Sequence, residues 1–348
     1  MYTAAIKFEN DKLKIIDQTL IPASVKYIEL KSLDETINAI KKLKIRGAPA
    51  IGIVAAYAMY IEAQKLKARS YQEFQNEMNI ICDLLHNARP TAVNLSWAIN
   101  RIKPIYSNAL NKSVSEIIKL IRQESINIHE EDKEACRKMG INGLSVISNP
   151  CNILTHCNTG SLATGGWGTA LGIIYAAKEK NYNIHVYVDE TRPLGQGARL
   201  TFWELMNNNI SCTLITDSTS GSLMRSGIID IVLFGADRIA ANGDVANKIG
   251  TYCIAALAHL NKIPCYAVAP TSTLDISIKT GKDIPIEHRS AQEILHIYGY
   301  NDNLPGNAEV YNPAFDITPA DLLSGIITER GIIYPPFNDK ITKAVIKT

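Results

Sequence analysis

A thiol beside an amide is the feature of this sequence best suited to chemistry. Cys157, Asn158 and Thr159 closely follow the apolar run Asn152–Thr155, which is typical of a buried strand. In open α/β sheets, ligands bind beyond the carboxyl ends of the strands. Packing alone would fill such an edge with larger apolar side chains, so these polar groups indicate a ligand site.

Four other predicted strands also end in polar or small residues. These strands are Ile184–Val188, Ser211–Ile215, Ile229–Phe234 and Pro264–Val268, and the residues at their ends are Asp189-Glu190-Thr191-Arg192, Asp217-Ser218, Gly235-Ala236-Asp237-Arg238 and Pro270-Thr271-Ser272. Helical patterns separate the strands, and this alternation predicts a parallel, doubly wound sheet. The polar ends should then meet at one edge of the sheet.

The two most reactive side chains also have ordinary structural explanations. Cys157 would be an inert buried thiol, and Asp237 would cap a helix or pair with Arg238. A papain-like pairing of Cys157 with His156 is disfavoured, because neighbours along a strand point to opposite faces. The residues alone leave these alternatives open.

Two arginines stand just ahead of predicted helix starts. Arg46 precedes Gly47, Ala48 and Pro49, and the pattern recurs at Arg89-Pro90-Thr91-Ala92-Val93-Asn94. Proline suits the first helical position, where free backbone N–H groups attract anions. The pattern predicts a phosphate or sugar-phosphate clamp. The competing explanation is that both arginines cap neighbouring helix ends.

Nucleotide and metal sites find little support. Gly166, Gly168 and Gly172 have the wrong spacing for a dinucleotide fingerprint and come too late after the strand, although Asp189 lies about where a ribose-binding acid would. The seven histidines form no ligand-spaced pair with a carboxylate, which disfavours a metal site. We expect neither a cofactor nor a metal ion.

The predicted architecture is α/β in two domains. Residues 149–348 form a Rossmann-like domain with a doubly wound parallel sheet. Residues 1–148 precede it as a mostly helical domain with a small antiparallel β element, formed by Ala4–Phe8 and Lys12–Ile16. Gly140 and Gly143 mark the passage between the two domains.

Composition narrows the class of protein. The 348 residues are 46% hydrophobic and 20% charged, and 36 basic residues against 34 acidic ones give a net charge of +2. This balance gives no argument for nucleic acid or a membrane surface as a partner. Seven scattered cysteines without a C-x-x-C pair favour reduced thiols in the cytoplasm. The amino terminus has no signal-peptide core, and the longest apolar run, 48–61, is too short to span a bilayer.

Six motifs of the sequence belong together: Arg46-Gly47-Ala48-Pro49-Ala50-Ile51-Gly52, Arg89-Pro90-Thr91-Ala92-Val93-Asn94-Leu95, Thr155-His156-Cys157-Asn158-Thr159-Gly160, Asp189-Glu190-Thr191-Arg192-Pro193 with Gln196-Gly197-Ala198-Arg199-Leu200-Thr201, Gly235-Ala236-Asp237-Arg238-Ile239, and Asn247-Lys248-Ile249-Gly250-Thr251-Tyr252. In this order they resemble the motifs of the methylthioribose-1-phosphate isomerases of methionine salvage, and the likeness extends from about residue 20 to 335. The wider family also holds ribose-1,5-bisphosphate isomerases and regulatory subunits of translation initiation factor 2B.

The resemblance implies an aldose–ketose isomerase that converts 5-methylthioribose 1-phosphate to 5-methylthioribulose 1-phosphate. Asp237 would be the proton donor and Cys157 the second catalytic residue. The residues implied to hold the sugar phosphate are Arg46, Gly47, Ala48, Arg89, Gln196, Asn247 and Lys248. Relatives pair through the sheet domain, so a homodimer is expected.

Four positions depart from the family pattern. Ser161, Gly166 and Trp167 stand where alanine, alanine and tyrosine are usual, and His288 replaces a glutamate. The glycine-rich changes bear on the pocket for the 5-substituent, so 5-deoxyribose 1-phosphate and ribose 1,5-bisphosphate stay open as substrates. A non-catalytic regulatory subunit is the other alternative. Such a subunit would lack Cys157 or Asp237, and both residues are present.

Overall fold

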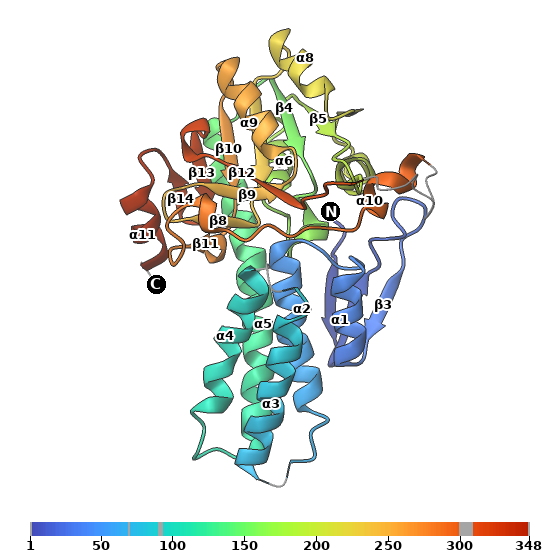
Figure 1. The fold of residues 1–348 in the computed structure, drawn as a ribbon, viewed down its shortest axis with the longest axis vertical. Helices are drawn as coiled ribbons and strands as arrows, with labels where there is room; N and C mark the ends of the chain where they lie inside the picture. Colours follow the sequence, from blue (N-terminus) through green and yellow to red (C-terminus); the bar gives the residue numbers. More distant parts are fainter. Residues whose placement is uncertain (1, 69, 90–92, 299–308, 347–348) are drawn as a thin grey trace. The chain divides into compact units, whose positions relative to one another are not determined.

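The computed structural model describes residues 2–68, 70–89, 93–298 and 309–346. The chain divides into two compact units (Figure 1). One consists of Met1–Arg137 with Gly160–Gly168, and the other of Lys138–Thr159 with Thr169–Thr348. The predicted domain boundary at residue 148 therefore lies inside the second unit, and the loop 160–168 groups with the first.

The first unit begins with a small antiparallel sheet in the order β1-β2-β3. Its strands are β1 (Ile6–Glu9), β2 (Lys12–Ile16) and β3 (Tyr27–Leu30). Asn10 and Asp11 both have positive φ and make the turn between β1 and β2. The predicted hairpin is confirmed, whereas its third strand was not predicted.

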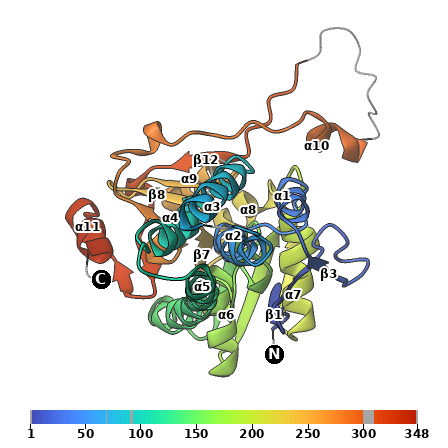
Figure 2. The same cartoon turned by 90° about the horizontal axis from the view of Figure 1, so that it is seen from below.

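Five helices follow, and one of them is buried around its whole circumference. They are α1 (Leu33–Lys41), α2 (Ala48–Ala63), α3 (Tyr71–His86), α4 (Val93–Ser107) and α5 (Val114–Gly143). Helix α2 is apolar on all sides, as expected of the central helix of a bundle, and α3, α4 and α5 run alongside it (Figures 1 and 2). Ser125 of α5 donates a hydrogen bond to the carbonyl of Ala56 in α2 at 2.9 Å.

The second unit is built on a seven-stranded sheet. Its strands are β4 (Cys151–His156), β5 (Ile184–Asp189), β6 (Cys212–Ile215), β7 (Ile231–Gly235), β10 (Cys265–Val268), β13 (Gly325–Thr328) and β14 (Gly331–Ile333). The order is β14-β13-β10-β7-β4-β5-β6, and only the edge strand β14 is antiparallel to its neighbour. All five predicted strands are confirmed. The six parallel strands have the Rossmann order, which reverses between β4 and β7.

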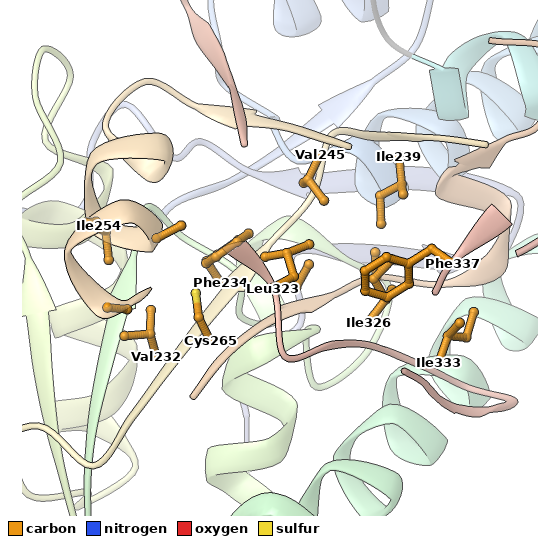
Figure 3. Close-up of a cluster of buried hydrophobic side chains, with 14 of the residues drawn as sticks. Val232, Phe234, Ile239, Val245, Ile254, Cys265, Leu323, Ile326, Ile333 and Phe337 are labelled. Atoms are coloured by element: carbon orange, nitrogen blue, oxygen red, sulfur yellow. The ribbon is translucent and has the colours of Figure 1, made fainter. Parts of the chain in front are cut away.

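Helices connect these strands and cover the sheet. They include α6 (Ala170–Glu179), α7 (Phe202–Asn207), α8 (Thr219–Arg225) and α9 (Thr251–Leu260). Figure 3 shows one core cluster, in which Val232 and Phe234 of β7 lie with Ile254 of α9. Phe337, just before α11 (Asn338–Ile346), belongs to the same cluster. Among the described residues, none of the helices has the length and apolar character needed to cross a membrane.

A second, smaller sheet was not predicted. It has the order β11-β8-β9-β12 and consists of β8 (Arg238–Ala240), β9 (Val245–Lys248), β11 (Leu274–Asp275) and β12 (Phe315–Thr318). A four-residue helix, α10 (Gln292–Leu295), precedes β12. These strands are two to four residues long, too short for an alternating pattern to be recognised in the sequence.

Candidate active site

Cys157 is held in a strained conformation directly after β4. Its φ is +63°, a left-handed value that is uncommon for a residue other than glycine. The Cys157 N–H donates to Oγ1 of Thr191 at 2.9 Å, and the Cys157 carbonyl accepts from Oγ1 of Thr201 at 2.6 Å. The side chain is buried, with 7% of its surface exposed. Strain that the surroundings hold in place in this way is characteristic of functional sites.

Hydrogen bonds to residues at the ends of β5 and β6 hold Thr191 in place. Its φ is +64°, a clear outlier for a β-branched residue. The Thr191 N–H donates to Asp217 at 2.7 Å, and its hydroxyl donates to the carbonyl of Asp189 at 3.0 Å. The second oxygen of Asp217 accepts from the N–H of Arg192 at 2.8 Å. The ends of β5 and β6 thus fix the group that holds Cys157.

His156 is engaged away from Cys157. Its Nδ1 lies 3.2 Å from Asp189 Oδ2, and its Nε2 lies 3.0 Å from the carbonyl of Ile249. Both nitrogens therefore have partners other than the thiol, in agreement with the argument against a papain-like pair. Burial raises the pKa of Asp189 to about 6, although the bond from His156 lowers it. Burial opposes the charge on His156, but the bond to Asp189 and its negative charge outweigh this, so the pKa of His156 is raised.

One group of possible metal ligands was not recognised in the sequence. Ligand atoms of His156, Asp189 and Asp217 lie within 4.8 Å of one another. No sequence spacing indicates this, because the three residues end three different strands. Hydrogen bonds within the protein already engage these groups: Asp217 accepts two backbone N–H groups, and Asp189 shares its buried charge with His156.

Asp237 follows β7, the strand that is paired with β4. The register places His156 opposite Phe234, so Cys157 and Asp237 leave neighbouring parallel strands at the same edge. Such strands lie about 4.8 Å apart. This edge is the switch point of the Rossmann order, where ligands bind in folds of this type. The structure therefore places the two residues predicted to be catalytic just after neighbouring strands, and Asp237 is half-buried.

The strand β9 brings Asn247 beside Asp237. The Asp237 N–H donates to the Ala246 carbonyl at 2.9 Å, and Arg238 pairs with Ala246. Asn247 is buried and donates to Oγ1 of Thr251 at 2.9 Å.

Lys248 ends β9. It is 9% exposed, and its Nζ donates to the carbonyl of Ala314 at 2.8 Å and lies 4.8 Å from the ring centroid of Phe315. The next helix, α9, begins at Thr251, after Gly250 in the left-handed region. Lys248 is therefore close to a helix start but belongs to the strand β9.

Gln196 is buried at 4% exposure near the end of β5. Its Oε1 has no hydrogen-bond partner among the described residues, which leaves an acceptor for a ligand. The next residue, Gly197, lies so close to Asp189 that an added Cβ would be 1.6 Å from its carbonyl oxygen. Only glycine fits there, and the chain brings Gln196 to the same edge as Thr191.

The other four predicted ligands belong to the first unit. Gly47, with a φ of +95°, is the N-cap of α2, and Ala48 and Pro49 are its first two helical residues. Arg46 is half-buried and directly precedes this turn. An added Cβ on Gly47 would lie 2.4 Å from the carbonyl oxygen of Ala163, so the loop 160–168 packs directly on the turn.

The second arginine pattern is only partly described. Arg89 is half-buried, but the predicted helix start at Pro90, Thr91 and Ala92 lies outside the described residues, and α4 is described from Val93.

Two supporting residues were not singled out from the sequence. Thr201 contacts the Cys157 carbonyl directly, and Glu204 accepts a hydrogen bond from Asn158 Nδ2 at 2.6 Å. Glu204 is 1% exposed, although its setting in a short helix after a polar loop resembles a surface position. A carboxylate buried to this degree has a partner, and only the fold shows which one.

The family model and the sequence relatives of this chain indicate the same family. The model of the initiation factor 2 subunit family matches residues 44–335. The methylthioribose-1-phosphate isomerase of Acetivibrio thermocellus is 51% identical over 97% of this chain and 98% of its own length. The enzyme of the same name from Desulforamulus reducens is 48% identical over 97% of this chain and 98% of its own.

Solved structures agree with these sequence relatives. The crystal structure of 5-methylthioribose 1-phosphate isomerase from Pyrococcus horikoshii has a TM-score of 0.89 and 42% identity, and the match covers 98% of this chain and 95% of that one. A structure described as translation initiation factor eIF-2B subunit delta from A. fulgidus has a TM-score of 0.84 and 41% identity, covering 98% and 99%. This chain belongs to the initiation factor 2 subunit family, within which it groups with the methylthioribose-1-phosphate isomerases.

Proposed function

We propose that this protein is an aldose–ketose isomerase that converts 5-methylthioribose 1-phosphate to 5-methylthioribulose 1-phosphate in methionine salvage. The observation that supports the proposal is that Cys157 and Asp237 follow neighbouring parallel strands at the switch point of the sheet. Relatives that share 47–51% of its residues over nearly the whole chain bear the name of this enzyme.

Asp237 supplies the acid in this proposal. The phosphate on C1 prevents spontaneous ring opening, so the enzyme must protonate the ring oxygen while the C1–O bond breaks. A half-buried carboxyl group that follows a fully buried strand is suited to donate that proton.

Hydrogen then moves from C2 to C1, and Cys157 is compatible with two routes. As a thiolate it removes the C2 proton and an enediolate forms. As a thiol it forms a weakly polar wall past which a hydride migrates. Its 7% exposure keeps water away in either case. Neither route requires a redox cofactor or a metal ion.

The proposal assigns the sugar phosphate to seven residues. Arg46 and Arg89 provide guanidinium groups, and the Gly47–Ala48 turn offers free N–H groups at the start of α2. Gln196, Asn247 and Lys248 are buried polar groups near the strand ends, suited to the sugar hydroxyls and the phosphate.

A side-by-side turnover assay tests this function. The substrates are methylthioribose 1-phosphate, 5-deoxyribose 1-phosphate and ribose 1,5-bisphosphate, and we expect the highest kcat/KM for the first. Preference for either of the others moves the protein to another isomerase of the family, and turnover of none supports a regulatory subunit. The same reaction in deuterated water separates the routes, because full deuterium entry at C1 eliminates hydride transfer.

We also propose a cytoplasmic setting for the enzyme, which its cysteines support. All seven are free thiols, which suits a reducing cytoplasm. We propose a homodimer that requires no nucleic acid or membrane partner. Sedimentation equilibrium tests the dimer, and a monomer at micromolar concentration contradicts it.

A further inference from the structure

We propose that Thr201 is a positioning residue for this reaction: its hydroxyl group holds the carbonyl of Cys157 and thereby fixes the direction of the thiol. This inference rests on the proposed function, in which the Cys157 thiol faces the substrate. Thr201 does not touch the reacting atoms. It acts through the backbone of the residue that does.

The backbone of Cys157 needs such support. A φ of +63° is unfavourable for any residue with a Cβ, and the relaxed alternative at negative φ would turn the side chain away. Two threonine hydroxyls hold the peptide groups on either side of this torsion. Thr191 accepts from the N–H at 2.9 Å and Thr201 donates to the carbonyl at 2.6 Å, and both threonines are fully buried.

The hydroxyl of Thr201 has a fixed direction because a third group occupies its lone pair. Asn158 Nδ2 lies 3.2 Å from Thr201 Oγ1 and 2.6 Å from Glu204 Oε1. A carboxylate only accepts, so Glu204 fixes the Asn158 amide with its NH₂ group toward both oxygens. Thr201 then accepts from Asn158 and directs its own hydrogen at the Cys157 carbonyl.

Glu204 is anchored on its other side as well. Its Oε2 accepts from the Tyr175 hydroxyl of α6 at 3.3 Å, and the carboxylate is 1% exposed. A series of hydrogen bonds therefore connects the helices α6 and α7 to the strained residue Cys157. Buried polar networks whose groups are satisfied rigidify their surroundings in this way.

The experiment compares three substitutions by kcat and KM for methylthioribose 1-phosphate. Thr201→Val keeps the shape and removes the hydroxyl, and Thr201→Ser restores it. Thr328→Val is the matched control, because Thr328 is also buried and donates to a carbonyl, that of Gly331 at 2.9 Å, on a different strand.

We expect Thr201→Val to lower kcat by about 10- to 100-fold with KM within about twofold, since small misplacements of a reacting group have effects of this size. Thr201→Ser should recover most of kcat, and Thr328→Val should keep it.

A second readout reports the thiol without turnover. Alkylation by iodoacetamide, followed peptide by peptide, should change several-fold at Cys157 in Thr201→Val. Cys265 is 1% exposed and sits in the same sheet, so its unchanged protection shows that the fold is intact. If Thr201→Val does not fold, Thr201→Ala carries the same test, because it also lacks the hydroxyl.

The outcomes separate the two proposals. Wild-type kcat and wild-type alkylation of Cys157 in Thr201→Val overturn the positioning role, as does an equal loss of kcat in Thr328→Val. Cys157→Ala with normal turnover overturns the catalytic role of Cys157 and the positioning role with it. An inactive Cys157→Ala beside a fully active Thr201→Val overturns the positioning role alone.

Discussion

His129 should make the protein less stable in mild acid. Its ring is 3% exposed, its Nδ1 lies 3.0 Å from the Tyr57 hydroxyl, and it packs on Gly165 in the loop after Cys157. Burial, with a smaller contribution from nearby Lys133, lowers the pKa of His129 from 6.5 to about 4, although Glu130 and a hydrogen bond with the backbone of Gly165 oppose the change. The folded state thus prefers the neutral ring.

The sign and size follow from proton linkage. Between pH 6.5 and 4 the unfolded chain binds a proton at His129 that the folded chain does not, so the free energy of unfolding falls as the pH falls. The fall of the pKa from 6.5 to about 4 corresponds to about 3 kcal/mol at pH 4. The stabilisation is fully present above pH 6.5 and is lost as the pH approaches 4.

Urea unfolding at pH 7, 5.5 and 4 measures this effect for the wild type and His129→Gln. Other groups also titrate in this range, so the informative quantity is the difference between the two proteins. We expect the advantage of the wild type to shrink by about 3 kcal/mol from pH 7 to pH 4. Tyr57→Phe keeps the imidazole and should keep the wild-type pH dependence. Parallel pH profiles for the wild type and His129→Gln would refute the reasoning.

Two further substitutions test other parts of the site. Arg46→Ala should weaken binding of methylthioribose 1-phosphate at least about tenfold, because a charged hydrogen bond to phosphate contributes about 1.5–3 kcal/mol. The control in the same titration is Lys42→Ala, because Lys42 is exposed. Unchanged affinity of Arg46→Ala would contradict the proposed phosphate clamp. Gly197→Ala should lower both kcat and the melting temperature, because its Cβ would lie 1.6 Å from the Asp189 carbonyl oxygen and 2.9 Å from Thr191 Oγ1. In Gly227→Ala no atom lies within 4 Å of the new Cβ, so only the positive φ is penalised, by about 1–2 kcal/mol. Equal effects of the two glycine substitutions would contradict the clash.

Much of the sheet could be predicted because its strands are continuous apolar runs. Val232, Leu233 and Phe234 in β7 are all fully buried, as expected for a central parallel strand covered on both faces. The small sheet could not be predicted in the same way. Its strand β12 pairs with β9 across more than sixty residues, Phe315 opposite Lys248, and each strand has only four residues.

The sequence predicts which site residues follow the ends of strands. It does not predict the contacts between residues that are far apart in the chain. Cys157 and Asp237 each follow an apolar run, so the sequence indicates that they meet at one edge. The support of Cys157 by Thr201 and Glu204 is different in kind, because it depends on a loop that returns to the end of β4. The pairing of His156 with Asp189 likewise joins two strands, and no local spacing encodes it.

The turnover of methylthioribose 1-phosphate by Cys157→Ala and Asp237→Asn tests the central claim most directly. The two residues leave neighbouring strands at the switch point and are assigned the two catalytic roles. We predict that each variant folds like the wild type, still binds the sugar phosphate, and loses at least about 100-fold in kcat, the lower range for a positioned acid or base. Near-normal turnover by either variant would contradict the account and remove that residue from the mechanism.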